Sequence, residues 1–288
     1  MVYRKDTLLT YAQLLILSSN YTVWYTMAKT FQSEMMSYLY ERADIYDLIE
    51  SDSREQIIRK DWAAFLGDRE IHSMLDVSIG TGTMTLPLQE LGITIFGSDL
   101  SESMLSRCQI KAENKHIPIE LKCCDFRDLS CWGDHQFDCV VSTGNSLAYV
   151  SNEEVLQTLE QMDRHVKSGG YLCFDSRNWE KIQREKQRFY VFNPFYKDNV
   201  RVNYLQVWDH HDDGTITFNL LYCFEENNRI FQKEIFEEHY FPFPKCIIEK
   251  KMYEMGYDNI ELRPLPCMIE ETNFAKIDWY RLIGRKAI

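Results

Sequence analysis

Five short apolar runs, separated by segments with helical spacing, occupy the middle of this 288-residue chain. They lie at 73–77, 94–97, 119–123, 137–142 and 171–175. Strands that alternate with helices form a parallel sheet with helices on both faces. Two further strands are expected near the C-terminal end, so the sequence predicts an α/β fold with a doubly wound, mostly parallel seven-stranded sheet.

The regions before and after this central segment have different hydrophobic patterns. Residues 1–70 carry apolar residues at helical spacing, which predicts an N-terminal helical arm and cap. Over residues 199–241, period-two alternation and the turn at Asp213-Gly214 predict an inserted antiparallel β meander. A helix ended by Gly256 and closing strands at 259–262 and 279–284 follow. The predicted divisions are 1–70 (arm and cap), 71–190 (α/β core), 191–245 (meander) and 246–288 (closing helix and strands).

The composition excludes several classes of partner. Lysine and arginine number 32 against 44 acidic residues, giving a net charge of −12, so we expect no nucleic-acid partner. The apolar stretch Leu8–Leu17 is shorter than the ~20 residues of a spanning helix, so no membrane partner is expected. A signal peptide is the alternative, but an A-x-A cleavage site is missing, and we expect a cytoplasmic protein. The nine cysteines show no CxxC spacing, which predicts reduced, buried thiols and no metal site.

A glycine turn follows the first predicted strand, in LDVSIGTGT at residues 75–83. Gly80 and Gly82 lie where a strand ends and a helix begins, so the backbone can approach a ligand closely there. The pattern is not G-x-G-x-x-G, because the third position is Thr85, and no G-K-[ST] sequence occurs. These departures argue against a pyrophosphate dinucleotide. The turn still predicts a nucleotide-like cofactor at this edge of the sheet.

Two acidic residues follow the second and third predicted strands. Asp99, 19 residues after Gly80, has two oxygens that can accept hydrogen bonds from the hydroxyls of a ribose. Asp125 can accept from an adenine amino group while Phe126 packs beside the base. Taken singly, a Gly-x-Gly turn is more often structural, and Asp99 equally fits a helix cap. Their order along successive strand ends predicts S-adenosyl-L-methionine as the cofactor.

With these residues in this order, the chain resembles the class I S-adenosylmethionine-dependent methyltransferases over residues 38–286. The resemblance implies a Rossmann-like core, methyl transfer and S-adenosyl-L-homocysteine as product. It implies that Asp76 and the glycine turn hold the methionine moiety, Asp99 the ribose and Asp125 the adenine. Ser78-Ile79 departs from the small or cysteine residues often found at that turn. The predicted cofactor-binding residues are Asp76, Ser78, Gly80, Thr81, Gly82, Asp99, Leu100, Met104, Asp125, Phe126, Ser142, Thr143 and Gly144.

The methyl acceptor is expected at the ends of the fourth and fifth strands. Asn145 can orient a polar group there, and Arg177 can hold a carboxylate through two hydrogen bonds. A turn role for Asn145 and a surface ion pair for Arg177 are the alternatives. With their neighbours Gly144, Ser146 and Asn178, they resemble the glycine and sarcosine N-methyltransferase branch. This likeness implies substrate binding by Asn145, Arg177, Tyr196, Tyr222 and Tyr240, although core packing equally explains the tyrosines.

The predicted function is therefore methyl transfer to the nitrogen of a small amine or amino acid. N-methylation of a nucleotide-linked amino sugar, or methylation of another small metabolite, is the alternative, and a non-catalytic cofactor-binding protein is a third. Attack of a neutral amine on an activated methyl group needs mainly alignment, and the sequence identifies no general base. The resemblance also implies a homo-oligomer, with the apolar stripe at 8–16 contacting a second subunit.

Overall fold

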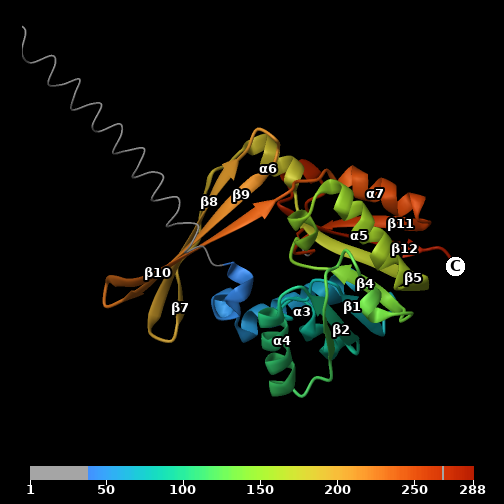
Figure 1. The fold of residues 1–288 in the computed structure, drawn as a ribbon, viewed down its shortest axis with the longest axis horizontal. Coiled ribbons are helices and arrows are strands. Elements are labelled where there is room, and N and C mark those ends of the chain that lie inside the picture. The colour runs from blue at the N-terminus through green and yellow to red at the C-terminus, as the bar shows by residue number, and fades with distance from the viewer. Residues whose placement is uncertain (1–37, 268) are drawn as a thin grey trace, which may run out of the picture. The chain divides into compact units, whose positions relative to one another are not determined.

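One sheet contains the five strands predicted from the apolar runs and the two predicted near the C-terminal end. The strands are β1 (Ser73–Asp76), β2 (Thr94–Asp99), β3 (Glu120–Cys123), β4 (Phe137–Ser142), β5 (Val166–Arg177), β11 (Tyr257–Pro264) and β12 (Trp279–Lys286). They lie in the order β11-β12-β5-β4-β1-β2-β3 (Figure 1). Strands β1 to β5 pair in parallel, whereas β12 is antiparallel to both of its neighbours. The prediction of a mostly parallel seven-stranded sheet is confirmed.

Helices cover both faces of this sheet because successive strand residues face opposite sides. Leu75 and Val140 face the core formed with α5 (Asn152–Arg164) and α7 (Lys245–Glu254), while Met74 and Cys139 face α3 (Asp52–Leu66) and α4 (Glu102–Asn114). The remaining helical elements are short: η1 (Leu39–Glu41), α2 (Ala43–Tyr46), η2 (Asp47–Ile49), η3 (Leu86–Leu91), η4 (Ser130–Trp132), η5 (Ser146–Tyr149), α6 (Trp179–Glu185) and η6 (Phe274–Lys276). This two-sided burial confirms the doubly wound arrangement.

A second, antiparallel sheet is inserted between α6 and α7 (Figure 1). Its strands are β6 (Phe189–Val191), β7 (Phe195–Lys197), β8 (Val200–His210), β9 (Ile216–Glu226) and β10 (Arg229–Tyr240). Strands β8, β9 and β10 form the predicted meander, and both β6 and β7 pair with β8. The chain leaves β10 beside η5, where the Phe241 amide donates to the Ala148 carbonyl at 2.7 Å. The inner face of this sheet therefore lies against the segment that follows β4.

The computed structural model describes residues 38–267 and 269–288, and Tyr38–Ile288 form one compact unit. The predicted arm before residue 38, with its apolar stripe and its oligomer contact, lies outside the described residues. Among the helices that are described, none is long and apolar enough to cross a membrane. The nine cysteines are free, but the prediction that all are buried is wrong, because Cys123 lies on the edge strand β3 and is exposed.

Candidate active site

The turn after β1 contains two glycines that serve different purposes. Both have positive φ, 54° at Gly80 and 81° at Gly82. A Cβ at Gly82 would approach Leu86 Cδ1 to 2.5 Å and Cys108 Sγ to 2.7 Å, so this glycine lets the turn pack tightly on its neighbours. A Cβ at Gly80 would meet nothing within 4 Å. Gly80 thus faces open space at the carboxyl ends of the strands, where sheets of this type bind ligands.

Asp76 ties this turn to the end of β4. Its carboxylate is fully buried and accepts from Thr143 Oγ1 at 2.8 Å, Thr85 Oγ1 at 3.0 Å and the Ser78 amide at 3.2 Å. Burial raises the pKa of Asp76 to about 7. Ser78 adds a second tie, because its hydroxyl lies 3.0 Å from that of Ser142. The structure therefore shows Asp76 bonded to protein groups that shape the turn.

Asp99 connects β2 to the same turn. Its Oδ2 accepts from the Gly80 amide and its Oδ1 from the Ser101 amide, each at 2.9 Å. Ser101 caps α4 by accepting from the Met104 amide, so the alternative of Asp99 as the helix cap is wrong. Burial raises the pKa of Asp99. The cavity at this point is lined by residues that include Tyr40, Tyr46, Gly80, Thr81, Asp99, Thr143 and Gly144.

Four other predicted cofactor residues lie around the ends of β2 and β3. The carboxylate of Asp125 accepts from Arg127 Nε at 3.0 Å and Nη2 at 2.6 Å, and this arginine holds the pKa of Asp125 low. Phe126 is partly buried against the core, Leu100 is exposed, and Met104 is fully buried. None of the four lines the cavity beside Gly80. Their contact with the cofactor stays a prediction.

Asn145 is the N-cap of η5 and has a left-handed conformation, with φ of 66°. Its backbone amide donates to Asp175 Oδ1 at 3.1 Å, and its side-chain oxygen accepts from the Arg177 amide at 3.0 Å. The side-chain nitrogen is buried and has no hydrogen-bond partner in the described part of the chain. The side-chain oxygen of Asn145 therefore has the local structural role that the sequence left open as the alternative. The side-chain nitrogen is an unpaired hydrogen-bond donor beside Arg177.

The guanidinium of Arg177 lies among aromatic rings. Its central carbon is 4.4 Å from the ring centre of Trp279, 5.1 Å from that of Trp208 and 5.3 Å from that of Phe218. Burial lowers its pKa, and within residues 38–267 and 269–288 no carboxylate pairs with it. The nearby Asp278 pairs with Lys181 instead. A half-buried cation without a partner is costly, so this site favours a bound anion.

The three predicted tyrosines do not all lie in this region. Tyr240 is buried with its ring centre 4.5 Å from that of Phe218, and Tyr222 stacks on Tyr204 at 4.5 Å. Tyr196 is 67% exposed on β7, and its place in the acceptor site stays a prediction without support from this geometry. Sequence reasoning missed Tyr204, although period-two alternation puts it on the same face of β8 as Trp208.

Sequence reasoning also missed Glu238, which is 5% exposed on β10. Tyr149 donates a hydrogen bond to its Oε2, and Tyr240 donates to the same oxygen at 3.5 Å. The Tyr149 hydroxyl lies 2.6 Å from those of both Tyr40 and Tyr240. The signal was present in the alternation of β10, which puts Phe236, Glu238 and Tyr240 on one face, all buried.

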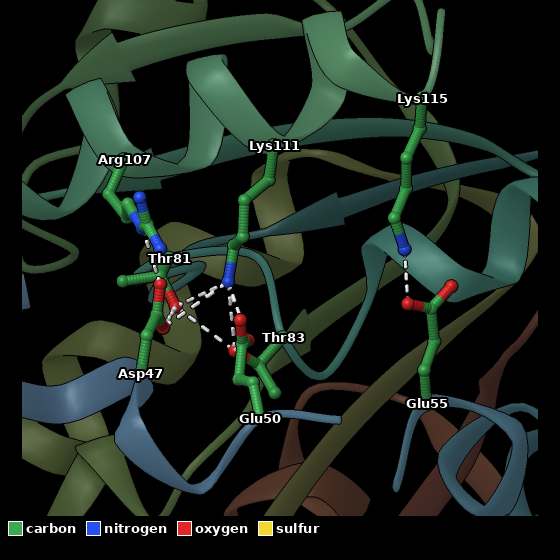
Figure 2. A network of polar contacts seen from close by, with 8 residues as sticks. All are labelled: Asp47, Glu50, Glu55, Thr81, Thr83, Arg107, Lys111 and Lys115. Carbon is green, nitrogen blue, oxygen red and sulfur yellow. Dashed lines mark hydrogen bonds and ion pairs between the residues drawn. The ribbon is translucent and has the colours of Figure 1, made fainter. Parts of the chain in front are cut away.

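An ionic network fastens the first helical segments to the glycine turn. Figure 2 shows Asp47 and Glu50 facing Lys111 and Arg107 of α4. Asp47 accepts from Arg107 Nε at 2.7 Å, from Thr81 Oγ1 at 2.7 Å and from Lys111 Nζ at 3.3 Å. Lys111 also donates to Glu50 at 2.6 Å. The segment that carries Tyr40 and Tyr46 is thereby held next to the turn.

Comparisons with known proteins identify the fold and its core. Residues 74–170 match a family model described as a methyltransferase domain. A putative methyltransferase of Geobacillus sp. (strain WCH70) is 37% identical over 110 residues, which cover 38% of this chain and 44% of that protein. The glycine/sarcosine N-methyltransferase of Aphanothece halophytica is 26% identical over 235 residues, which cover 80% of this chain and 82% of that protein.

A solved S-adenosylmethionine-dependent methyltransferase from Clostridium acetobutylicum ATCC 824 has the same fold, with a TM-score of 0.69 at 17% identity over 85% of this chain and 98% of that one. Residues 74–170 are therefore a methyltransferase domain, and the methyl donor that such a domain implies is S-adenosyl-L-methionine. The predicted family is confirmed, and the similarity to a glycine/sarcosine N-methyltransferase extends over most of the chain. The match to the Geobacillus relative spans less than half of that protein.

Proposed function

We propose that this protein transfers a methyl group from S-adenosyl-L-methionine to the nitrogen of a small amine that carries a carboxylate, such as glycine or sarcosine. The observation that supports this proposal is a pair of unused donors at the ends of β4 and β5. The Asn145 side-chain nitrogen is buried without a partner, and the Arg177 guanidinium has no anion beside it in the described chain. A carboxylate would satisfy both groups at once.

The residues around the glycine turn fit the cofactor. Gly80 leaves room for a ligand, and the outer lone pairs of the Asp99 carboxylate suit the hydroxyls of a ribose. When bound, the cofactor supplies a methyl group that is already activated by a positively charged sulfur. Tyr40 and Tyr46 line the same cavity. The task left to the protein is to align a neutral amine with that methyl group.

The aromatic side chains of the second sheet suit an acceptor that becomes positively charged. The ring of Tyr240 lies 5.3 Å from that of Trp179 and 4.5 Å from that of Phe218, and Tyr222 is stacked on Tyr204. The faces and hydroxyls of such rings stabilise sulfonium and ammonium groups. These aromatic rings support nitrogen as the methylated atom, because the amine gains positive charge as it is methylated.

We expect Arg177→Leu to lower kcat/KM for the acceptor by roughly 10- to 100-fold, because hydrogen bonds to charged groups contribute about 1.5–3 kcal/mol. The measurement is S-adenosylhomocysteine release from purified protein given separate pools of small amino acids, biogenic amines and amino sugars. Binding of S-adenosylmethionine, followed by calorimetry, should stay unchanged.

Arg188→Leu is the matched control, because Arg188 also lies over an aromatic ring, that of Phe189, but on the exposed β6 side of the sheet. It should leave acceptor kinetics as they are. Turnover with amino sugars alone, or an Arg177 variant that matches the wild type, would contradict the carboxylate proposal. Cofactor binding without turnover in any pool would favour a non-catalytic protein.

A further inference from the structure

We propose that Glu238 binds the ammonium group of the methyl acceptor and takes up its proton, so that a neutral amine is ready for methylation. This inference rests on the function proposed above and names a residue for the one chemical step that alignment alone leaves open. It also narrows the substrate class, because a carboxylate at Arg177 and an ammonium at Glu238 together describe an amino acid zwitterion.

The position of Glu238 supports this role. It projects from the inner face of β10, directly opposite Phe218 of β9, whose ring lies beneath Arg177. Its Oε2 is occupied by the hydroxyls of Tyr149 and Tyr240. No residue of the described ranges donates a hydrogen bond to Oε1. One oxygen is thus fixed by tyrosines, and the other is left for a donor that the protein itself does not supply.

Glu238 also lacks the counter-ion that a buried carboxylate normally has. Glu234, four residues earlier on the same face, pairs with Arg42, but no lysine, arginine or histidine of the described chain pairs with Glu238. An ionised carboxylate without a partner is unfavourable inside a protein, and a bound ammonium would remove that penalty. The described groups that influence it or its hydroxyl neighbours are Tyr40, Tyr46, Asp99, Tyr149, Arg177 and Tyr240.

Tyr240 links the two ends of the proposed acceptor site. The negative charge of Glu238 raises the pKa of the Tyr240 hydroxyl, and the positive charge of Arg177 lowers it. A zwitterion placed beside this ring would have its carboxylate toward Arg177 and Asn145 and its ammonium toward Glu238. The N–H bond of the ammonium breaks, its electron pair stays on nitrogen, and the proton forms an O–H bond on Glu238.

The protonation behaviour of Glu238 suits this exchange. Burial raises its pKa to about 8, whereas an alkylammonium in water titrates near ~10.4. Because the carboxyl group must be ionised to accept a proton, activity should fall as the pH drops through about 8. Proton transfer to a carboxylate with this pKa is far less uphill than transfer to an ordinary glutamate.

The first test compares pH profiles of kcat/KM for the wild type and Glu238→Gln, with whichever amine the wild type methylates. We expect the variant to lose about 100-fold near pH 8, the low end of what general bases contribute. Its remaining activity should keep rising toward the pKa of the free amine. Glu237→Gln is the control, because Glu237 faces the other side of β10 and pairs with His239. A Glu238 variant with the wild-type profile would overturn the proposal.

The second test measures binding without turnover, by competition of glycine or acetate with the acceptor. Glu238→Gln should weaken glycine at least 10-fold and leave acetate unchanged, whereas Arg177→Leu should weaken both. Tyr149→Phe, which removes one donor to Glu238 but keeps its charge, should retain glycine binding. If acetate and glycine respond alike to Glu238→Gln, Glu238 does not bind the ammonium. Failure of the proposed function is distinct, since it appears as insensitivity to Arg177→Leu in the same assay.

Discussion

Replacing Arg281 with methionine should lower the free energy of unfolding by about 3–5 kcal/mol, the range for removing one partner of a buried ion pair. Arg281 is 1% exposed, and its Nη1 donates to Asp61 Oδ2 at 3.1 Å while its Nη2 lies 3.8 Å from Asp175 Oδ2. Its guanidinium stacks over Trp62 at 3.6 Å from the ring centre. Without it, two carboxylates remain buried with no positive charge between them.

The pH dependence of this loss follows from the same contacts. Burial raises the pKa of Asp175, and the charge of Arg281 opposes that shift. Once the arginine is removed, the folded-state pKa rises further above the unfolded value of about 3.9. The folded state then binds more protons between these two values, so its stability falls as the pH rises through that window. The variant should therefore be closest to the wild type near pH 4.

Urea unfolding at pH 4.5 and pH 8 measures both effects. Arg285→Met is the control, because Arg285 lies on the same strand but is exposed, and its side chain donates to the Gly169 carbonyl rather than to a buried carboxylate. It should change stability by no more than about 0.5 kcal/mol. A loss below about 1 kcal/mol for the Arg281 variant, in the range of exposed pairs, would show that the buried pair does not stabilise the fold.

The fold could be predicted because it depends on local periodicity. The apolar runs of β1 to β5 lie within a few residues of their predicted positions, and the alternation over residues 199–241 correctly indicated antiparallel pairing. Asp99, Asn145 and Arg177 were predicted as site residues for a related reason. Each comes at the end of a parallel strand, and the carboxyl ends of such strands meet at one edge of the sheet.

The rest of the site depends on contacts between distant segments. Glu238 lies in the polar run FEEHY, which is typical of a solvent-exposed segment. In the structure it is bonded to Tyr149, which lies 89 residues earlier in the chain. Tyr196 and Tyr190 are both aromatic residues near β8, but the register puts Tyr190 opposite Gln206, with its ring 3.8 Å from that of Trp208. No local pattern specifies which of two nearby tyrosines a later strand will cover.

Replacing Lys111 with methionine should destabilise the protein by about 3 kcal/mol, the lower end for breaking a buried ion pair. Among the residues that the structure describes, Asp47, whose side chain is 3% exposed, would keep Arg107, which is 43% exposed, as its one charged partner. Lys115→Met is the control at the C-cap of the same helix. Its ion pair with Glu55 is shown in Figure 2, and the two side chains are 41% and 27% exposed. That change should cost no more than about 1 kcal/mol.

The same two variants separate stability from cofactor binding. Lys111 and Asp47 both bond to the hydroxyl of Thr81, the residue between Gly80 and Gly82. Without the Lys111 contact, the glycine turn is less ordered in the free protein. Binding of S-adenosylmethionine must then also order the turn, and this cost weakens the binding. We expect calorimetry to show weaker binding for Lys111→Met and unchanged binding for Lys115→Met. Equal affinities in the two variants, with Lys111→Met alone destabilised, would mean that the network stabilises the fold without organising the cofactor site.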